Sequence, residues 1–169
     1  MTQEFLQDAL VADLAQLFEG ETLRNSTGME RHIRVYSQDV PIRAGADIEK
    51  PLEDWEVPEF EPEDVPEPYV IVRLPGGEQP AQDQHQIVQV VLVVCVYDPA
   101  PDRQGIRDAL HIVNTIMHHY GSNGVVGKRY MVQYPIKWVT QEEDTHPYYF
   151  AGMALTFEAP AIFKEVPET

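Results

Sequence analysis

The sequence predicts an α+β fold in which helices pack on one face of an antiparallel, or mixed, β-sheet. Two amphipathic segments, residues 5–18 and 102–120, have the apolar spacing of helices. Four further runs have the branched and aromatic composition of strands: 69–74, 87–97, 130–139 and 148–158. The order is helix, irregular arm, strand pair, helix, strand pair, which is typical of helices layered on an antiparallel sheet.

The first helix has apolar residues at spacings of three and four, and Gly20 then offers a stop. Its predicted buried positions are Phe5, Leu6, Ala9, Leu10, Leu14, Leu17 and Phe18. A short alternation of residue types around 32–36 predicts a short strand after it.

Residues 47–68 form an acidic, proline-rich segment with ten Asp or Glu residues and five prolines. So many prolines exclude a long helix or a central strand. Apolar side chains recur among the carboxylates, so we predict an extended arm that docks them on the same chain or on a neighbouring one. The candidate subunit or partner interface is Leu52, Trp55, Val57, Phe60, Glu59, Glu61, Glu63 and Asp64.

The second half of the chain supplies the rest of the sheet and the second helix. Residues 87–97 are almost continuously apolar, which predicts a central strand covered on both faces. After Asp98 to Pro101 ends that strand, Asp102 is placed to cap a helix. Its predicted apolar stripe is Ile106, Ala109, Leu110, Val113, Ile116, Met117 and Tyr120. Residues 141–147 then predict a hairpin connection between the last two strands.

Length and composition indicate one domain over 1–169 that includes the acidic arm at 47–68. The chain has 12 basic and 28 acidic residues, a formal net charge of −16, which opposes binding to nucleic-acid phosphates. The single cysteine, Cys95, lies in an apolar strand and predicts a small buried residue in a reducing compartment. No long apolar run or signal-like start is present, so we expect a cytoplasmic protein without a membrane span.

The residues that chemistry would need are present but poorly organised. His111 and His118 are two helical turns apart, about 10 Å, too far to share one zinc ion. His119 points in a different direction from His118. Two loop groups, Glu78 with Asp83 and His85, and Glu142, Glu143 and Asp144 with His146, are better explained as solvated loop residues. The glycines at 75–77 and 121–128 lack the phosphate-loop spacing. We therefore predict no enzyme activity, no cofactor and no metal site.

The order of elements, together with the segments DRQGIRDALHIVNTIMHHY and PYYFAGMALTF, resembles the tail terminator, or tail completion, proteins of long-tailed bacteriophages. The resemblance covers residues 69–160 best and matches 5–18 to the opening helix, while the acidic arm departs from the family plan. It implies a structural subunit of a homo-hexameric ring that caps the tail tube and joins it to head-completion proteins. It also implies assembly in the bacterial host cytoplasm and a final place in the tail or neck of the virion.

Two other functions remain open at this stage. An acidic binding module or inhibitor would use the carboxylate-rich arm to imitate nucleic acid and occupy a basic partner. A small hydrolase or metal-dependent enzyme would use His85 or His146, and metal analysis of the purified protein would detect the metal-dependent case.

Overall fold

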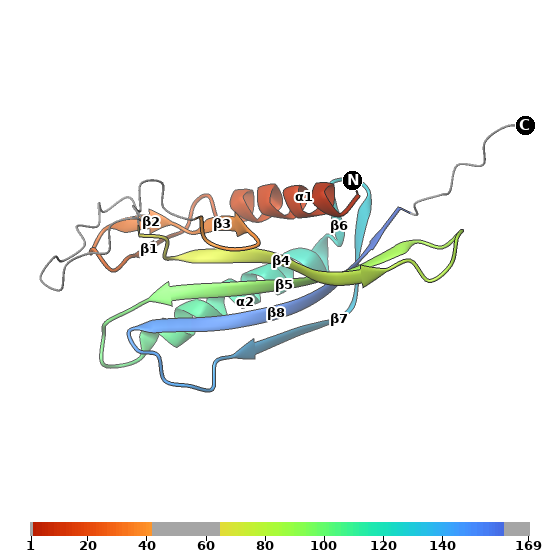
Figure 1. Cartoon of the computed structure of the whole chain (residues 1–169). Helices are drawn as coiled ribbons and strands as arrows, with labels where there is room; N and C mark the ends of the chain where they lie inside the picture. The colour runs from red at the N-terminus through yellow and green to blue at the C-terminus, as the bar shows by residue number, and fades with distance from the viewer. Residues whose placement is uncertain (1, 42–64, 161–169) are drawn as a thin grey trace, which may run out of the picture.

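The computed structural model describes residues 2–41 and 65–160, and the predicted interface residues Leu52 to Asp64 lie outside these ranges. The described part contains two helices and eight strands (Figure 1). In chain order they are α1 (Thr2–Leu17), β1 (Thr22–Arg24), β2 (Glu30–His32), β3 (Arg34–Ser37), β4 (Tyr69–Glu78), β5 (Gln86–Tyr97), α2 (Gln104–Ser122), β6 (Val125–Val126), β7 (Tyr130–Thr140) and β8 (Tyr148–Ala159).

Six of these strands form one mixed sheet in the order β3-β4-β5-β8-β7-β6. Only the β3–β4 pair is parallel, and all the other neighbours are antiparallel. The strands β1 and β2 form a separate two-stranded hairpin. The two long hairpins, β4–β5 and β7–β8, meet through the β5–β8 pairing in the middle of the sheet.

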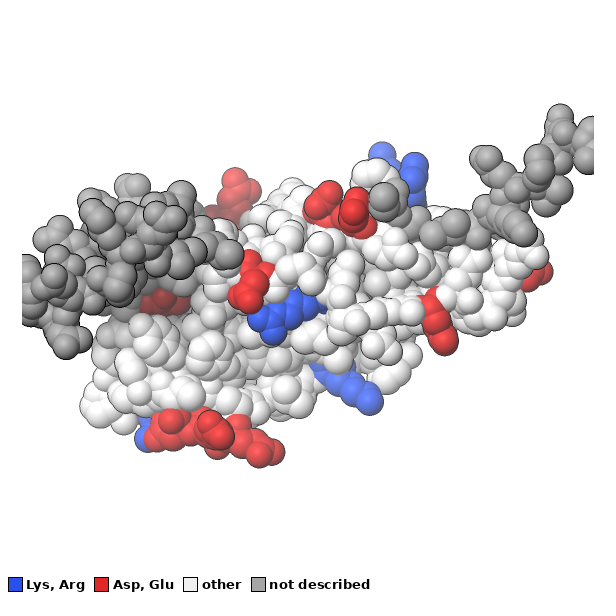
Figure 2. Space-filling view, in the orientation of Figure 1, with Lys and Arg blue, Asp and Glu red and all other residues white. Residues whose placement is uncertain are grey.

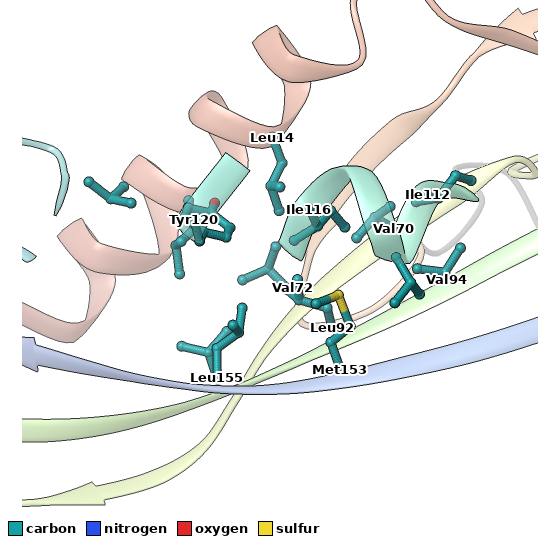
Figure 3. Packing of buried hydrophobic residues seen from close by; sticks show 14 of the residues in the cluster. Leu14, Val70, Val72, Leu92, Val94, Ile112, Ile116, Tyr120, Met153 and Leu155 are labelled. Atoms are coloured by element: carbon teal, nitrogen blue, oxygen red, sulfur yellow. The ribbon is translucent and has the colours of Figure 1, made fainter. Parts of the chain in front are cut away.

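Both helices pack on the same side of this sheet. In Figure 1 the strands lie in front of α2, which crosses behind β5 and β8, and α1 runs along the β3–β4 side. The core between them consists of alternate residues of the long strands and the inner stripes of α1 and α2 (Figure 3). Tyr120 of α2 meets Phe157 of β8 edge to face, with ring centroids 5.8 Å apart. The predicted α+β class, with helices on one face of the sheet, is therefore confirmed.

The alternation along β5 shows that the prediction of a strand covered on both faces is wrong for most of its length. Val88, Val90, Leu92, Val94 and Val96 face the helices and are buried. The residues between them point to the opposite side of the sheet, where Gln89 is exposed and Val91 and Val93 are only partly buried. A continuous apolar run thus reflects a sheet with apolar residues on both faces but helices on one.

The structure also differs from the sequence prediction in which residues of the two helices are buried and in where the second helix begins. Phe5 was expected on the buried face of the first helix but is 57% exposed. The second helix begins at Gln104, with Asp102 accepting a hydrogen bond from the Gln104 backbone N–H at 3.1 Å. Ile112, which the sequence reading omitted, is buried in the inner stripe of α2, whereas Leu110 is only partly buried.

The first strand of the β4–β5 hairpin is longer than predicted. It continues beyond Leu74 through residues 75–77 to Glu78, with an irregularity in the register between Arg73 and Gly76. Residues 75–77 therefore belong to the strand, because the bulge takes up the proline and glycines without ending the pairing. The hairpin connection predicted at 141–147 is confirmed by the β7–β8 pairing.

Candidate functional site

The sheet face opposite the helices, called the outer face below, is the main candidate for an interaction surface. Two rows of four residues cross it from β4 to β7: Ile71, Val93, Gly152 and Val139, then Arg73, Val91, Ala154 and Lys137. Neither row contains a carboxylate, although the chain has 28 acidic residues. Figure 2 shows this side of the molecule, over β4, β5, β8 and β7, as a broad surface with few charged side chains.

Small side chains make the middle of the outer face flat. Ala154 is exposed and Gly152 is partly buried. Because both residues are small, a partner protein can contact the larger side chains beside them on β5 and β7. Val139 on β7 is 65% exposed. A sheet face that combines exposed apolar residues with a few basic ones and no carboxylate in these rows fits a protein interface.

One end of the outer face is closed by the chain itself. Ile71 and Cys95 are each 2% exposed. Nearby, the Glu67 carboxylate accepts a hydrogen bond from the Ser26 backbone N–H at 3.1 Å, and Glu67 is itself buried. Burial, opposed in part by a hydrogen bond with Tyr69, raises the pKa of the Cys95 thiol to about 12. Cys95 is therefore the buried, unreactive residue that its sequence context predicted.

The edge of the sheet at β7 is open over most of its length. The strand β6 pairs only with Tyr130 and Met131, so within the described ranges no strand covers the edge beyond the start of β7. Three large apolar side chains are exposed along this stretch: Tyr134 at 72%, Trp138 at 50% and Val139 at 65%. An exposed strand edge of this kind is a ready template for pairing with another chain.

The opposite edge is better protected. The strand β3 covers Tyr69 to Val72 of β4, and the Gln38 side chain accepts a hydrogen bond from the Leu74 backbone N–H at 2.9 Å. The next residue, Pro75, has no N–H to offer. The sheet therefore ends in the short strand β3 on this side, whereas on the other side most of the much longer β7 forms the edge within the described residues.

The loop after β7 has a fixed shape. The Gln141 side chain donates to the Glu143 carbonyl at 2.8 Å and accepts from the Thr145 hydroxyl and the Phe150 backbone N–H, each at 2.9 Å. Asp144 forms two 2.9 Å hydrogen bonds with the Arg103 guanidinium at the start of α2. This contact, followed by a backbone hydrogen bond from His146, lowers the pKa of Asp144 to about 2.

The suspected acid–base cluster at 142–146 is thus a structural latch between the β7–β8 loop and α2. Asp144 is occupied by Arg103, and the His146 Nδ1 lies 2.8 Å from the Tyr149 hydroxyl. Tyr149 in turn packs so closely on Gly105 that a Cβ added there would lie 2.2 Å from its ring. The side chains of Glu142 and Glu143 have no ion pair with any residue in the described ranges.

The three helix histidines do not converge. His111 Nε2 lies 3.4 Å from a Glu21 carboxylate oxygen, and His119 Nε2 lies 2.7 Å from one of Asp13, while His118 is exposed. The two paired histidines connect α2 to α1 and to the residues that follow it. Their arrangement supports helix packing.

The other loop group, Glu78 with Asp83 and His85, does not form a catalytic or metal site. His85 Nε2 lies 3.5 Å from Glu158, which also accepts a 3.0 Å hydrogen bond from Gln133, in a shallow pocket that Asp83 helps to line. Glu78 lies at the end of β4, outside that pocket. Across residues 2–41 and 65–160, no group of three or more His, Cys, Asp and Glu side chains is placed to hold a metal ion.

The glycine-containing segments have structural positions. Residues 75–77 belong to β4, and 121–128 lead from the end of α2 into β6. Neither segment precedes a helix whose N-terminus would receive a phosphate. None of the helices in the described part is long and apolar enough to cross a membrane.

Sequence reasoning missed the open edge of β7. The position of Trp138 in a predicted strand does not by itself show which edge of the sheet lacks a partner. The signal available was the run from Tyr130 to Thr140, which has one basic residue and no acidic one in a strongly acidic chain. The arm residues Leu52 to Asp64, the predicted interface, lie outside the described ranges.

A scan against models of known protein families finds no match to this chain, and a search of curated proteins finds no relative. The outer face and the β7 edge are therefore the features from which a function can be inferred.

Proposed function

We propose that the chain is a structural subunit of a phage or prophage tail, a tail terminator-like component that forms a homo-oligomeric ring, with six copies expected, at the end of the tail tube. In this role it contacts neighbouring copies, the tube and the head-completion proteins. It needs no cofactor and catalyses no reaction. Assembly takes place in the host cytoplasm, and the finished subunit is part of the virion tail or neck.

The observation that carries this proposal is the outer face, which no helix of the described part covers. The helices cover β4, β5 and β8 on one side of the sheet, whereas on the other side the rows through Val91 and Val93 contain no carboxylate, and their two charged residues, Arg73 and Lys137, are both basic. A ring requires each copy to offer surfaces that fit unlike surfaces of its neighbours. A broad sheet face next to an open strand edge supplies contact area of the right kind.

The element order supports the same reading. An opening helix, a β4–β5 hairpin, the helix α2 and a closing aromatic hairpin follow one another as in the family resemblance drawn from the sequence. Residues that could have belonged to a catalytic or metal site have structural roles instead: Asp144 binds Arg103, His119 contacts Asp13, and Cys95 is buried in the sheet. These contacts leave the surfaces of the sheet as the features that need a function.

The test is a substitution in the middle of the outer face. Ala154→Glu places a charge on an exposed alanine and leaves the helix side of β8 unchanged. Ala15→Glu on the exposed side of α1 is the matched control, because it makes the same change in charge and size on another surface. Light scattering measures the mass of each purified protein, and electron microscopy shows whether it adds a ring to the end of purified tail tubes.

We expect the unmodified chain and Ala15→Glu to form rings, alone or on tube ends, and Ala154→Glu to stay dissociated while circular dichroism shows a folded protein. If neither the unmodified chain nor the control associates with itself or with tubes, the proposal is wrong. If Ala154→Glu assembles as well as the control, the outer face is not the ring contact.

A further inference from the structure

We propose that the open edge of β7 pairs with the same edge of a second copy of this chain, in an antiparallel two-fold contact centred on Val139. The pairing would join two sheets into one continuous sheet. It uses the backbone edge of β7, next to the outer face at whose middle the ring proposal is tested, and its argument does not require that a ring forms.

The backbone of β7 is arranged for this pairing. The Gln141 N–H donates to the Phe150 carbonyl on β8 at 3.2 Å. By the alternation of an antiparallel ladder, Lys137 and Val139 direct their backbone groups to β8, and Trp138 and Thr140 direct theirs to the open edge. Within residues 2–41 and 65–160 no strand pairs with these outward groups, which can form a ladder with another strand. At the start of β7 the edge already receives such a bond, where Val132 donates to the Gly124 carbonyl at 2.7 Å.

The charges near this edge favour a second copy of the same strand. Lys137 lies two residues before Val139, and Glu143 lies four residues after it. None of Lys137, Glu142 and Glu143 has an ion-pair partner in residues 2–41 and 65–160. The hydrogen bonds of Gln141 hold the backbone of Glu143 beside the end of the strand, so its position is fixed before any partner arrives.

An antiparallel pairing about Val139 brings these unlike charges together twice. Residue 137 of one copy then lies opposite residue 141 of the other, with residue 143 as its diagonal neighbour. Lys137 of each copy therefore approaches Glu143 of the other. Val139, which is 65% exposed, meets its own equivalent at the two-fold axis, and Trp138 lies opposite Thr140.

This self-complementary order, basic then apolar then acidic, identifies a second copy as the occupant. A two-fold interface requires that the same patch fit itself, and the β7 edge satisfies this requirement with both charge and apolar contact. The free straight stretch is short, because the register with β8 shifts between Gln133 and Lys137. We therefore expect a weak dimer that forms at high protein concentration.

A cysteine scan tests the symmetry directly. Residues 137–141 are changed to cysteine one at a time in the full chain, under mild oxidation, with the unmodified protein, whose Cys95 is buried, as the background. Two-fold pairing about Val139 predicts the fastest disulfide dimer for Val139→Cys, because the two equivalent Cα atoms face each other across the axis. The yield should fall toward positions 137 and 141.

Charge reversal provides the second measurement. Lys137→Glu and Glu143→Lys should each weaken the dimer on the order of tenfold, since each places like charges across the pair twice. The combination of both changes should restore the dimer. Arg129→Glu, on an exposed loop residue outside the free edge, is the control for net charge and should have little effect relative to Lys137→Glu.

The outcomes separate this inference from the ring proposal. A peak of cross-linking at Val139→Cys with rescue by the double charge reversal supports the two-fold pairing, whether or not rings form on tubes. A folded protein that cross-links at none of positions 137–141 overturns it. A dimer that Lys137→Glu and Glu143→Lys leave unchanged also overturns it, and rings on tubes would then still support the ring proposal.

Discussion

Two neighbouring residues of β5, Val90 and Val91, provide a test of the one-sided packing on which the functional argument depends. Val90 faces the helices and is 0% exposed, whereas Val91 points to the outer face and is partly buried. Val→Thr at each position keeps the size, the branching and the strand preference of the side chain. The substitution therefore compares what covers the two faces of the same strand.

The expected magnitudes follow from the surroundings of the new hydroxyl group. At Val90 it enters an apolar layer that includes Leu92, Leu155 and Ile116, and burying a hydroxyl without a partner costs about 1–3 kcal/mol. At Val91 it remains within reach of water between Arg73 and Ala154, so we expect a change within about 0.5 kcal/mol. The expected difference in destabilisation is therefore roughly 1–3 kcal/mol.

Urea unfolding, followed by circular dichroism at low protein concentration, measures both free energies under conditions that disfavour association. An unchanged slope with a lower midpoint for Val90→Thr would show a loss of stability in the folded state. Equal destabilisation by the two substitutions would refute the reasoning, because it would mean that the outer face at Val91 is covered as fully as the helix face at Val90.

Three further predictions concern the contacts around α2 and the closed end of the outer face. Gly105→Ala should lower the free energy of unfolding in urea by about 1–3 kcal/mol, because its Cβ would lie 2.2 Å from the Tyr149 ring. Gly20→Ala, whose Cβ would have nothing within 4 Å, is the control. Equal stability of the two variants would contradict the close packing of Tyr149 on Gly105. In an NMR titration the Asp144 carboxyl should have a pKa of about 2 and return toward its usual value of about 4 in Arg103→Gln. Because the pKa of Asp144 is lowered in the folded state, the contact between Asp144 and Arg103 stabilises the fold above about pH 4, and this stabilisation is lost as the pH falls toward 2. An Asp144 pKa that Arg103→Gln leaves unchanged would contradict this contact. With a pKa of about 12, Cys95 should resist a thiol reagent at pH 8 in the native protein and react in urea, whereas fast native labelling would show that this end of the face is open.

The sequence was sufficient for the helices and for the main strands because each has a strong local signal. The period of the stripe from Ala109 to Tyr120 places α2 on the sheet, and the branched residues of β5 make it central. Local signals were weaker where tertiary contacts decide the outcome. Residues 75–77 look like a turn, yet pairing with β5 carries the strand through them as a bulge.

The candidate site was only partly predictable for a related reason. A continuous apolar strand indicates two apolar faces, but the sequence does not say whether a helix or another protein covers the second one. The arm at 52–64 drew the interface prediction because its composition is unusual, and that prediction remains untested. The exposure of Tyr134 and Trp138 depends on β6 ending after two residues, which is a property of the assembled sheet.

The distribution of charge connects these features to assembly. A chain with a net charge of −16 repels copies of itself wherever its carboxylates meet, so association requires surfaces from which acidic residues are absent or matched. The outer-face rows satisfy the first condition, and the β7 edge, with Lys137 before Val139 and Glu143 after it, satisfies the second. Raising the ionic strength should therefore strengthen contacts through the outer face, by screening the general repulsion, and strengthen the β7 pairing less, because salt also screens its Lys137–Glu143 attraction. Light scattering of the Lys137→Glu and Ala154→Glu variants across a salt series would separate the two contacts, and an identical salt response from both variants would show that a single surface governs association.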